Sequence, residues 1–236
     1  MQERCILKDG VKYIEKNGVS HIINDDGRIV NHRPWLGDIL SFAYDPIMEK
    51  CVFPGKFGGE ATRHFEILRN ELKGVHGRNV LELAAGSGSA VNFLPDDNRY
   101  AGIDISPGLL RRAVGRFRRA GFENAVFYVA RAEDLPFRDG VFDVVLCILS
   151  LNFFEDIPAV LAEIRRVAAA HAIVACSVPV PERNGRKRTI RGVLHSEREL
   201  ETLFEDAGFH FDPIHANNGS LLYFKATKKD APDETQ

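Results

Sequence analysis

The sequence is poor in cysteine and has no long apolar run, and both absences narrow what the protein can be. Its four cysteines are widely separated: they are Cys5, Cys51, Cys147 and Cys176. No two of them form the closely spaced pair of a redox motif or of half a zinc site. No apolar stretch approaches the roughly 20 residues that cross a bilayer, and the amino terminus has no apolar signal core. We therefore expect reduced thiols and a soluble, cytoplasmic protein without stable membrane association.

The sequence also lacks an excess of charge of either sign. Its 31 Lys and Arg residues nearly balance 33 Asp and Glu residues, for a formal net charge of −2. Such a balance produces no global field that attracts nucleic acid or anionic membranes, so we expect a small-molecule partner. Hydrophobic residues make up 44% of the 236 residues, which is enough for one substantial core. Nothing in the composition sets the oligomeric state.

Strand-like and helix-like patterns alternate from residue 79 to the carboxyl end. Five strand-like runs lie at 79–83, 99–105, 125–129, 142–149 and 171–178. Their separation by helical or loop segments predicts a mostly parallel sheet with helices on both faces. The last two runs, 208–215 and 220–227, are joined only by ANNG, so they must pair antiparallel. We predict an α/β fold with a Rossmann-like, doubly wound, mostly parallel seven-stranded sheet that ends in an antiparallel hairpin.

The first 60 residues follow a different pattern. The stretch VKYIEKNGVSHII alternates apolar and polar residues around Asn17-Gly18, which predicts a small antiparallel hairpin with a tight turn. The bulky apolar stretch from Trp35 to Phe53 ends in the glycine-rich PGKFGG, and we interpret it as a helical lid followed by a loop. An amphipathic helix comes next, marked by apolar residues at helical spacing: Ala61, Phe65, Leu68 and Leu72.

A carboxylate and a turn of small residues mark the end of the first strand of the alternating region. Glu82 lies inside the strand NVLEL, where an unpaired charge costs roughly several kcal/mol, so we expect a partner beside it. Gly86 and Gly88 follow at the carboxyl end of this strand, where ligands bind in open α/β sheets. The helix expected next would point its N–H groups at the same place. Asp104 ends the following strand, placed to bind both hydroxyls of a ribose. Together these residues indicate an adenosine-type cofactor site.

Residues 82–88 resemble the acidic-x-Gly-x-Gly-x-Gly motif of the class I S-adenosylmethionine-dependent methyltransferases, with Ala84 in place of the first glycine. The similarity runs from about residue 44 to residue 228. It is closest to the broad subgroup that includes the ubiquinone and menaquinone biosynthesis methyltransferases. The resemblance implies S-adenosylmethionine as cofactor, a turn that lines its methionine part, Glu82 near its ammonium group, Asp104 on the ribose and Ile105 on the adenine.

The same resemblance implies further cofactor contacts. The family usually has an Asp-Ala pair at the adenine edge, but Arg131 precedes Ala132 here. The backbone N–H of Ala132 remains available, and Glu133 is a candidate to replace the missing carboxylate. We also assign Cys147 to the cofactor site, and Tyr44, which belongs to a Tyr-Asp pair shared with the subgroup.

Some relatives carry a small amino-terminal zinc-binding segment, and VKYIEKNGVSHIIND is similar to its hairpin. Only Cys5 remains of any ligand set, so we predict no metal. We divide the chain into a hairpin and helical lid at 1–60, a methyltransferase domain at 61–228 and a frayed tail at 229–236.

The acceptor is expected to enter between the lid and the loops after the fourth and fifth strands of the alternating region. Candidate contacts there are Ser150, Asn152 and Arg186, the last in a basic loop that either holds an anionic substrate or is simply solvated. An activated methyl donor makes a catalytic base optional, because positioning supplies much of the acceleration. His195, just before the last helix, is a weak candidate base and equally a cap-region residue.

Two other functions stay open. One is a catalytically silent protein that binds S-adenosylmethionine for regulation, which Arg131 and the degenerate amino-terminal unit suggest. The other is an NAD-binding oxidoreductase. Val91, where that motif has its third glycine, and the carboxyl-terminal hairpin count against it.

Overall fold

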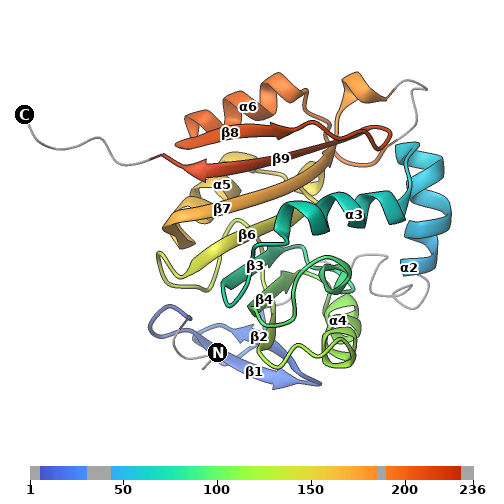
Figure 1. Ribbon diagram of the computed structural model, residues 1–236. Helices are drawn as coiled ribbons and strands as arrows, with labels where there is room; N and C mark the ends of the chain where they lie inside the picture. Colours follow the sequence, from blue (N-terminus) through green and yellow to red (C-terminus); the bar gives the residue numbers. More distant parts are fainter. Residues whose placement is uncertain (1–5, 31–43, 185–189, 230–236) are drawn as a thin grey trace, which may run out of the picture.

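The computed structural model describes residues 6–30, 44–184 and 190–229, and one sheet organises them (Figure 1). The sheet has nine strands in the order β1-β2-β5-β4-β3-β6-β7-β9-β8. The strands are β1 (Lys12–Lys16), β2 (Val19–Ile23), β3 (Asn79–Leu83), β4 (Arg99–Asp104), β5 (Ala125–Val129), β6 (Phe142–Ile148), β7 (Ala168–Pro179), β8 (Phe209–Ile214) and β9 (Leu221–Lys228). The α-helices are α2 (Tyr44–Ile47), α3 (Ala61–Leu72), α4 (Pro107–Arg119), α5 (Ile157–Val167) and α6 (Glu197–Asp206). Four shorter or irregular helices complete the fold: the π-helix η3 (Met48–Phe57) and the 3₁₀ helices η4 (Ser89–Asn92), η5 (Leu151–Phe153) and η6 (Pro181–Arg183).

The centre of the sheet is parallel, as predicted. Strand β3 lies between β4 and β6, and β5 and β7 extend the parallel set on either side. Strand β9 then pairs antiparallel with both β7 and β8, which confirms the predicted carboxyl-terminal hairpin. The short connection between β8 and β9 required this arrangement, because a parallel pair needs a crossover of a dozen or more residues.

The amino-terminal hairpin extends this sheet. Strands β1 and β2 pair antiparallel around Asn17 and Gly18, whose φ angles of 56° and 77° are those of a tight two-residue turn. The hairpin was expected to be a small unit beside a seven-stranded sheet. Instead β2 pairs parallel with β5, where Ser20 lies opposite Tyr128, and the sheet reaches nine strands. The division of the chain at residue 60 stays a prediction.

The two faces of the sheet bury separate apolar cores. Leu81 and Leu83 of β3 point into the core covered by α5 and α6. Val80 points into the core covered by α3 and α4, which the amphipathic patterns of these helices also line. Because successive strand residues point to opposite faces, Glu82 lies on the α3 and α4 side.

Two helical predictions were wrong in extent. The full helix expected after β3 is only the four-residue 3₁₀ helix η4. Pro95 and the polar residues that follow it favour a turn before β4 begins. The loop expected at PGKFGG begins only at Gly58, because the wide π-helix η3 accommodates Pro54 and continues to Phe57. The first part of the predicted lid, residues 35–43, lies outside the described residues, as do residues 230–236 of the predicted tail.

Candidate functional site

The carboxyl ends of β3, β4, β5 and β6 bring four loops to one edge of the sheet. The chain passes from β3 to β4 and β5 on one side, and then crosses to β6 and β7 on the other. Strand order therefore reverses between β3 and β6. Open α/β sheets bind ligands outside the carboxyl ends of the strands at such a switch point. The turn after β3, residues 84–88, lies there.

The small residues of this turn have separate structural reasons. Ala84, Gly86 and Gly88 have φ angles of 51°, 53° and 81°, in the left-handed region. Alanine at such an angle costs roughly 1 kcal/mol relative to glycine, so Ala84 carries local strain. A Cβ added to Gly88 would lie 2.9 Å from the Ala113 Cβ, so this glycine is needed for packing on α4. A Cβ added to Gly86 would meet only the Ala84 carbonyl, at 3.9 Å. Gly86 therefore leaves open space for a ligand beside its backbone.

Asp104 connects the end of β4 to the glycine turn. Its Oδ2 accepts a hydrogen bond from the Gly86 N–H at 2.9 Å, and its Oδ1 accepts one from the Ser106 N–H at 2.8 Å. Ser106 in turn caps α4 by accepting from the Leu109 N–H at 3.1 Å. The carboxylate is thus oriented by backbone donors at the place that the sequence predicted for it.

Glu82 finds its partner on the neighbouring strand. The Tyr100 hydroxyl donates a hydrogen bond to Glu82 Oε2, and both side chains are buried. The pKa of Glu82 is raised to about 8, mainly by burial. The charge of Asp104 adds to this increase, and the hydrogen bond from Tyr100 opposes it. Burial and the neighbouring Glu82 also raise the pKa of Tyr100 well above its ordinary value. Sequence reasoning missed Tyr100, although Gly102, which lies opposite Glu82, left room for a diagonal contact.

The loop after β5 carries the expected adenine contacts. Arg131 turns toward Glu133, and its Nε donates to Glu133 Oε2 at 3.2 Å. Ala132 between them is buried, at 4% exposure. On the adjacent strand end, Ile105 is 43% exposed, whereas its neighbours Asp104 and Ser106 are buried. The edge therefore presents an apolar side chain between anchored polar ones.

One predicted cofactor contact, Cys147, has its side chain turned away from the open edge of the sheet. Cys147 is fully buried in the core covered by α5 and α6, and its thiol lies 3.3 Å from the Ser150 hydroxyl. Because side chains alternate along β6, Cys147 points into that core and its side chain does not reach the open edge. Two other predicted contacts cannot be placed. The side chain of Tyr44 and all of Arg186 lie outside the described residues.

Ser150 and Asn152 lie together in the loop after β6, as predicted. Asn152 Nδ2 donates to the Arg191 carbonyl at 2.7 Å, and the Asn152 carbonyl accepts from the Val193 N–H at 2.8 Å. These bonds bring the segment after β7 against the loop after β6. The Oδ1 atom of Asn152 is buried and has no hydrogen-bond partner among the described residues.

The candidate base His195 lies just before the start of α6, and a second histidine, His64, lies on α3. His195 is half-buried and directly precedes Ser196, whose side chain caps α6 in a capping box with Glu199. His64 on α3 is buried and its Nδ1 lies 2.9 Å from the Tyr223 hydroxyl. Burial lowers the pKa of His64 to about 3, so the ring is neutral at physiological pH. Tyr223 also accepts a hydrogen bond from Asn218, so this cluster joins α3 to the turn before β9.

The site lies in the part of the chain that has known relatives. Residues 81–176 match the family model described as a methyltransferase domain. This part of the chain is therefore similar to known methyltransferase domains. The chain is 33% identical over 148 residues to the uncharacterized methyltransferase YcgJ of Bacillus subtilis (strain 168), which covers 62% of this chain and 53% of that protein. It is 32% identical over 109 residues to a demethylmenaquinone methyltransferase of Tropheryma whipplei (strain Twist), which covers 45% of this chain and 44% of that protein.

The chain also has the expected fold. The crystal structure of a SAM dependent methyltransferase from Aquifex aeolicus is similar with a TM-score of 0.62 at 17% identity, covering 78% of this chain and 96% of that one. The predicted resemblance to S-adenosylmethionine-dependent methyltransferases, menaquinone enzymes included, is confirmed. The cofactor of this class is S-adenosylmethionine, and neither alternative function is favoured. The chain spans about half the length of the curated relatives it matches.

The described residues contain neither a cluster of metal ligands nor a helix that could span a membrane. In that part of the chain, no three His, Cys, Asp or Glu side chains gather in a group that could hold a metal ion, and Cys5 lies outside it. No helix in the described ranges combines the length and apolarity of a membrane span.

Proposed function

We propose that this chain is an S-adenosylmethionine-dependent methyltransferase that transfers a methyl group to a small-molecule acceptor by in-line displacement. The observation that carries the proposal is the open backbone of Gly86 at the switch point, which Asp104 holds in place. A ligand there meets a carboxylate oriented by backbone N–H groups and, one residue further along, the exposed side chain of Ile105. This combination suits a ribose and an adenine side by side.

The residues of this edge fit the cofactor from end to end. Gly86 leaves room for its methionine part, Asp104 is placed for the ribose hydroxyls and Ile105 for the adenine face. The Ala132 N–H and the Glu133 carboxylate serve the adenine edge, with Arg131 holding Glu133. When bound, S-adenosylmethionine supplies a methyl group that its sulfonium has already activated.

Glu82 contributes charge beneath the glycine turn. With a pKa of about 8, its carboxyl group is largely protonated at pH 7 in the protein alone. A cationic ammonium nearby favours the ionised carboxylate, so binding releases a proton from Glu82 to solvent. The buried carboxylate then faces a unit positive charge in a site that excludes water, where the attraction is stronger than at the surface.

Asn152 is the proposed contact for the acceptor. Its Nδ2 bond to the Arg191 carbonyl fixes the amide orientation, so the unpartnered atom is the acceptor Oδ1. A buried acceptor without a partner costs about 1–3 kcal/mol, which an O–H or N–H of the bound molecule would recover. Phe153 and Val193 beside it are 55% and 62% exposed. The acceptor proposed is therefore a molecule with an apolar body and a hydroxyl or amine group.

The chain needs no base of its own for this reaction. Holding the nucleophile in line and excluding water contributes about 7–11 kcal/mol of a barrier in well-oriented systems. Asn152 Oδ1 would orient the acceptor's O–H or N–H so that its lone pair faces the methyl group. The proton then leaves to solvent.

The proposal is tested by calorimetric titration with S-adenosylmethionine and with its demethylated product. Micromolar binding by the wild type, and its loss in Asp104→Ala, is the expected result. Asp143→Ala is the matched control, because Asp143 accepts from the Asn79 N–H at the opposite edge of the sheet. Methyl transfer from labelled cofactor to a panel of apolar alcohols and amines would then define the acceptor. A wild type that binds neither form of the cofactor would refute the proposal.

A further inference from the structure

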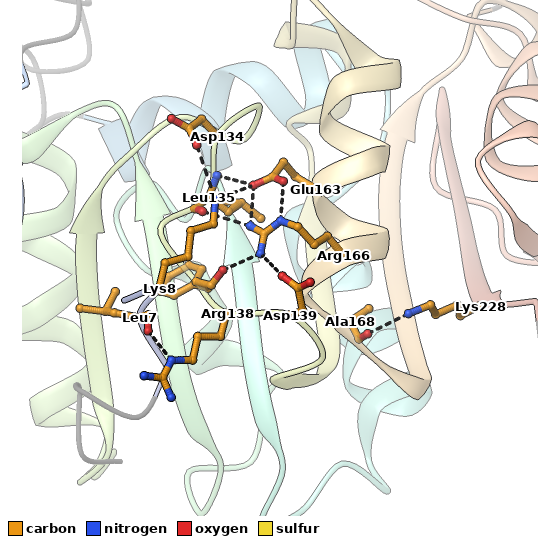
Figure 2. A network of polar contacts seen from close by, with 11 residues as sticks. Leu7, Lys8, Asp134, Leu135, Arg138, Asp139, Glu163, Arg166, Ala168 and Lys228 are labelled. Atoms are coloured by element: carbon orange, nitrogen blue, oxygen red, sulfur yellow. Dashed lines mark hydrogen bonds and ion pairs between the residues drawn. The ribbon is translucent and has the colours of Figure 1, made fainter. Parts of the chain in front are cut away.

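The connection from β5 to β6 is held without a helix. Residues 130–141 contain no helix, and polar contacts from two directions hold them instead (Figure 2). This connection is here called the adenine loop. Near its start lie the two residues proposed to contact the adenine edge, Ala132 and Glu133. What orders the loop therefore bears on cofactor binding.

Arg166 of α5 clamps the loop from one side. Its Nε and Nη2 bind the two oxygens of Glu163 at 2.6 and 2.7 Å, in a bidentate pair. Its remaining N–H groups donate to the loop: to the Leu135 carbonyl at 3.1 Å, the Phe137 carbonyl at 2.6 Å and Asp139 at 2.7 Å. All five guanidinium donors are thus used, three of them on the loop. Such a fork is both strong and geometrically specific.

Glu163 itself adds a bond to the same loop. Its Oε2 accepts from the Leu135 N–H at 2.7 Å, so the N–H and the carbonyl of Leu135 are both held by the pair from α5. Burial alone would raise the pKa of Glu163, but hydrogen bonds from Arg166 and Leu135 lower it below its ordinary value. The carboxylate is therefore ionised at neutral pH and keeps its partners.

The amino-terminal segment Ile6–Lys8 clamps the loop from the other side. The Lys8 N–H donates to the Pro136 carbonyl at 2.9 Å, and the Arg138 N–H donates to the Ile6 carbonyl at 2.8 Å. The Arg138 side chain also donates to the Leu7 carbonyl at 2.8 Å. Ile6 and Leu7 are buried in the same core as Leu135 and Phe137.

The side chain of Lys8 contacts both the adenine loop and α5. Its Nζ lies 3.8 Å from Asp134 Oδ1 and 3.9 Å from Glu163 Oε2. Figure 2 shows the Lys8 side chain reaching toward both carboxylates. Asp134 directly follows Glu133 and forms an isolated bridge with Arg131. Lys8 thus contacts the tip of the adenine loop through a side chain that is 39% exposed, so we expect its effect on stability to be small.

We propose that Lys8 and Arg166 are positioning residues for the cofactor: they hold the adenine loop in its binding conformation, so cofactor affinity depends on them. The proposal rests on the proposed function, because it assigns the adenine to Ala132 and Glu133. The physical reason is preorganisation. A loop that is ordered only on binding lowers affinity by the cost of ordering it. The buried side chains of Leu135 and Phe137 anchor the middle of the loop. Arg166 fixes the backbone of the same residues, and Lys8 contacts the tip at Asp134.

The test compares Lys8→Met and Arg166→Met with two matched controls. Lys12→Met removes an exposed lysine of β1. Arg165→Met removes the arginine next to Arg166 in the sequence, whose Nη1 donates to the Gly208 carbonyl just after α6. Calorimetry should show affinity for S-adenosylmethionine reduced severalfold in Lys8→Met and about tenfold in Arg166→Met. Lys8→Arg, which keeps the charge, should restore affinity to within about twofold of the wild type.

Hydrogen exchange in the protein without cofactor separates positioning from a general loss of structure. We expect faster exchange in residues 130–139 of both variants and unchanged exchange in β3. If Arg166→Met does not fold, Lys8→Met and its rescue by arginine carry the test. If the wild type binds the cofactor and the Lys8 and Arg166 variants bind it equally tightly, the positioning role is overturned and the proposed function stands. Equal losses of affinity in the two control variants would overturn the positioning role in the same way. A wild type that binds no cofactor would refute the proposed function, and the positioning role with it.

Discussion

The Tyr100 hydroxyl donates a hydrogen bond to the Glu82 carboxyl group in the buried layer beneath the glycine turn. The pair lies on adjacent strands, with Glu82 opposite Gly102 and Tyr100 two residues before it. A carboxyl group in this position, with a pKa of about 8, titrates over the pH range in which the protein is expected to work.

Glu82 should make the stability of the cofactor-free protein depend on pH. Its pKa is raised from 4.5 to about 8 on folding, so its favourable contribution is complete below pH 4.5 and is lost as pH rises to 8. We expect Glu82→Gln, which cannot ionise, to gain stability relative to the wild type between pH 5 and pH 8, by on the order of a few kcal/mol. Urea denaturation at both pH values measures this. Parallel changes in the two proteins would contradict the raised pKa.

Cofactor binding should release a proton from the same group. The cofactor's ammonium favours the ionised form of Glu82, which is largely protonated in the free protein at pH 7. Calorimetric titrations in two buffers with different ionisation enthalpies should give a net release that approaches one proton per cofactor. Glu82→Gln should bind with no such release, and wild-type heats that do not depend on the buffer would rule the coupling out.

The two glycines of the turn should respond differently to alanine. A Cβ at Gly86 has room and adds only the strain of φ 53°, so Gly86→Ala should fold with a loss of about 1 kcal/mol and bind the cofactor at least tenfold more weakly. A Cβ at Gly88 would press on Ala113 and Phe117, so Gly88→Ala should lose clearly more stability. Thermal unfolding and calorimetry check both, and the reverse order of stabilities would contradict the packing argument.

Replacing Asn152 should raise the KM for the acceptor and leave the affinity for the cofactor nearly unchanged. Asn152→Ala removes the buried Oδ1 proposed to orient the acceptor, so we expect a higher KM for the acceptor and cofactor affinity within about twofold of the wild type. Thr202→Ala on α6, away from the loop after β6, is the control. Steady-state kinetics with a competent acceptor provide the measurement, and an unchanged KM would remove Asn152 from the acceptor site.

Much of the fold followed from local patterns. The strand runs 79–83 and 125–129 coincide with β3 and β5, and the hairpin turn at Asn17-Gly18 has the positive φ angles that this dipeptide favours. Such patterns report which side chains face a core and which backbone angles a turn requires, and both are properties of neighbouring residues. The alternation of strands and helices determined the parallel sheet for the same reason.

Local pattern failed where distant segments compete. The helix expected after β3 is a single 3₁₀ turn, and the predicted separate hairpin joins the sheet edge at β5. The sequence placed Cys147 at the carboxyl end of β6, and only the structure shows that its side chain faces the core. Which face a strand residue takes depends on what the neighbouring strands and helices bury, and the sequence around it does not contain that information.

The sequence by itself determined where the proposed site lies, because Gly86, Asp104 and Ile105 stand at strand ends whose pattern is readable. Only the tertiary structure decided what supports them. Tyr100 beneath Glu82, Arg166 on the adenine loop and the segment Ile6–Lys8 reach the site from strands, helices and a terminus far along the chain. Hydrogen bonds between such segments depend on strand order and helix packing, which form together only in the complete fold.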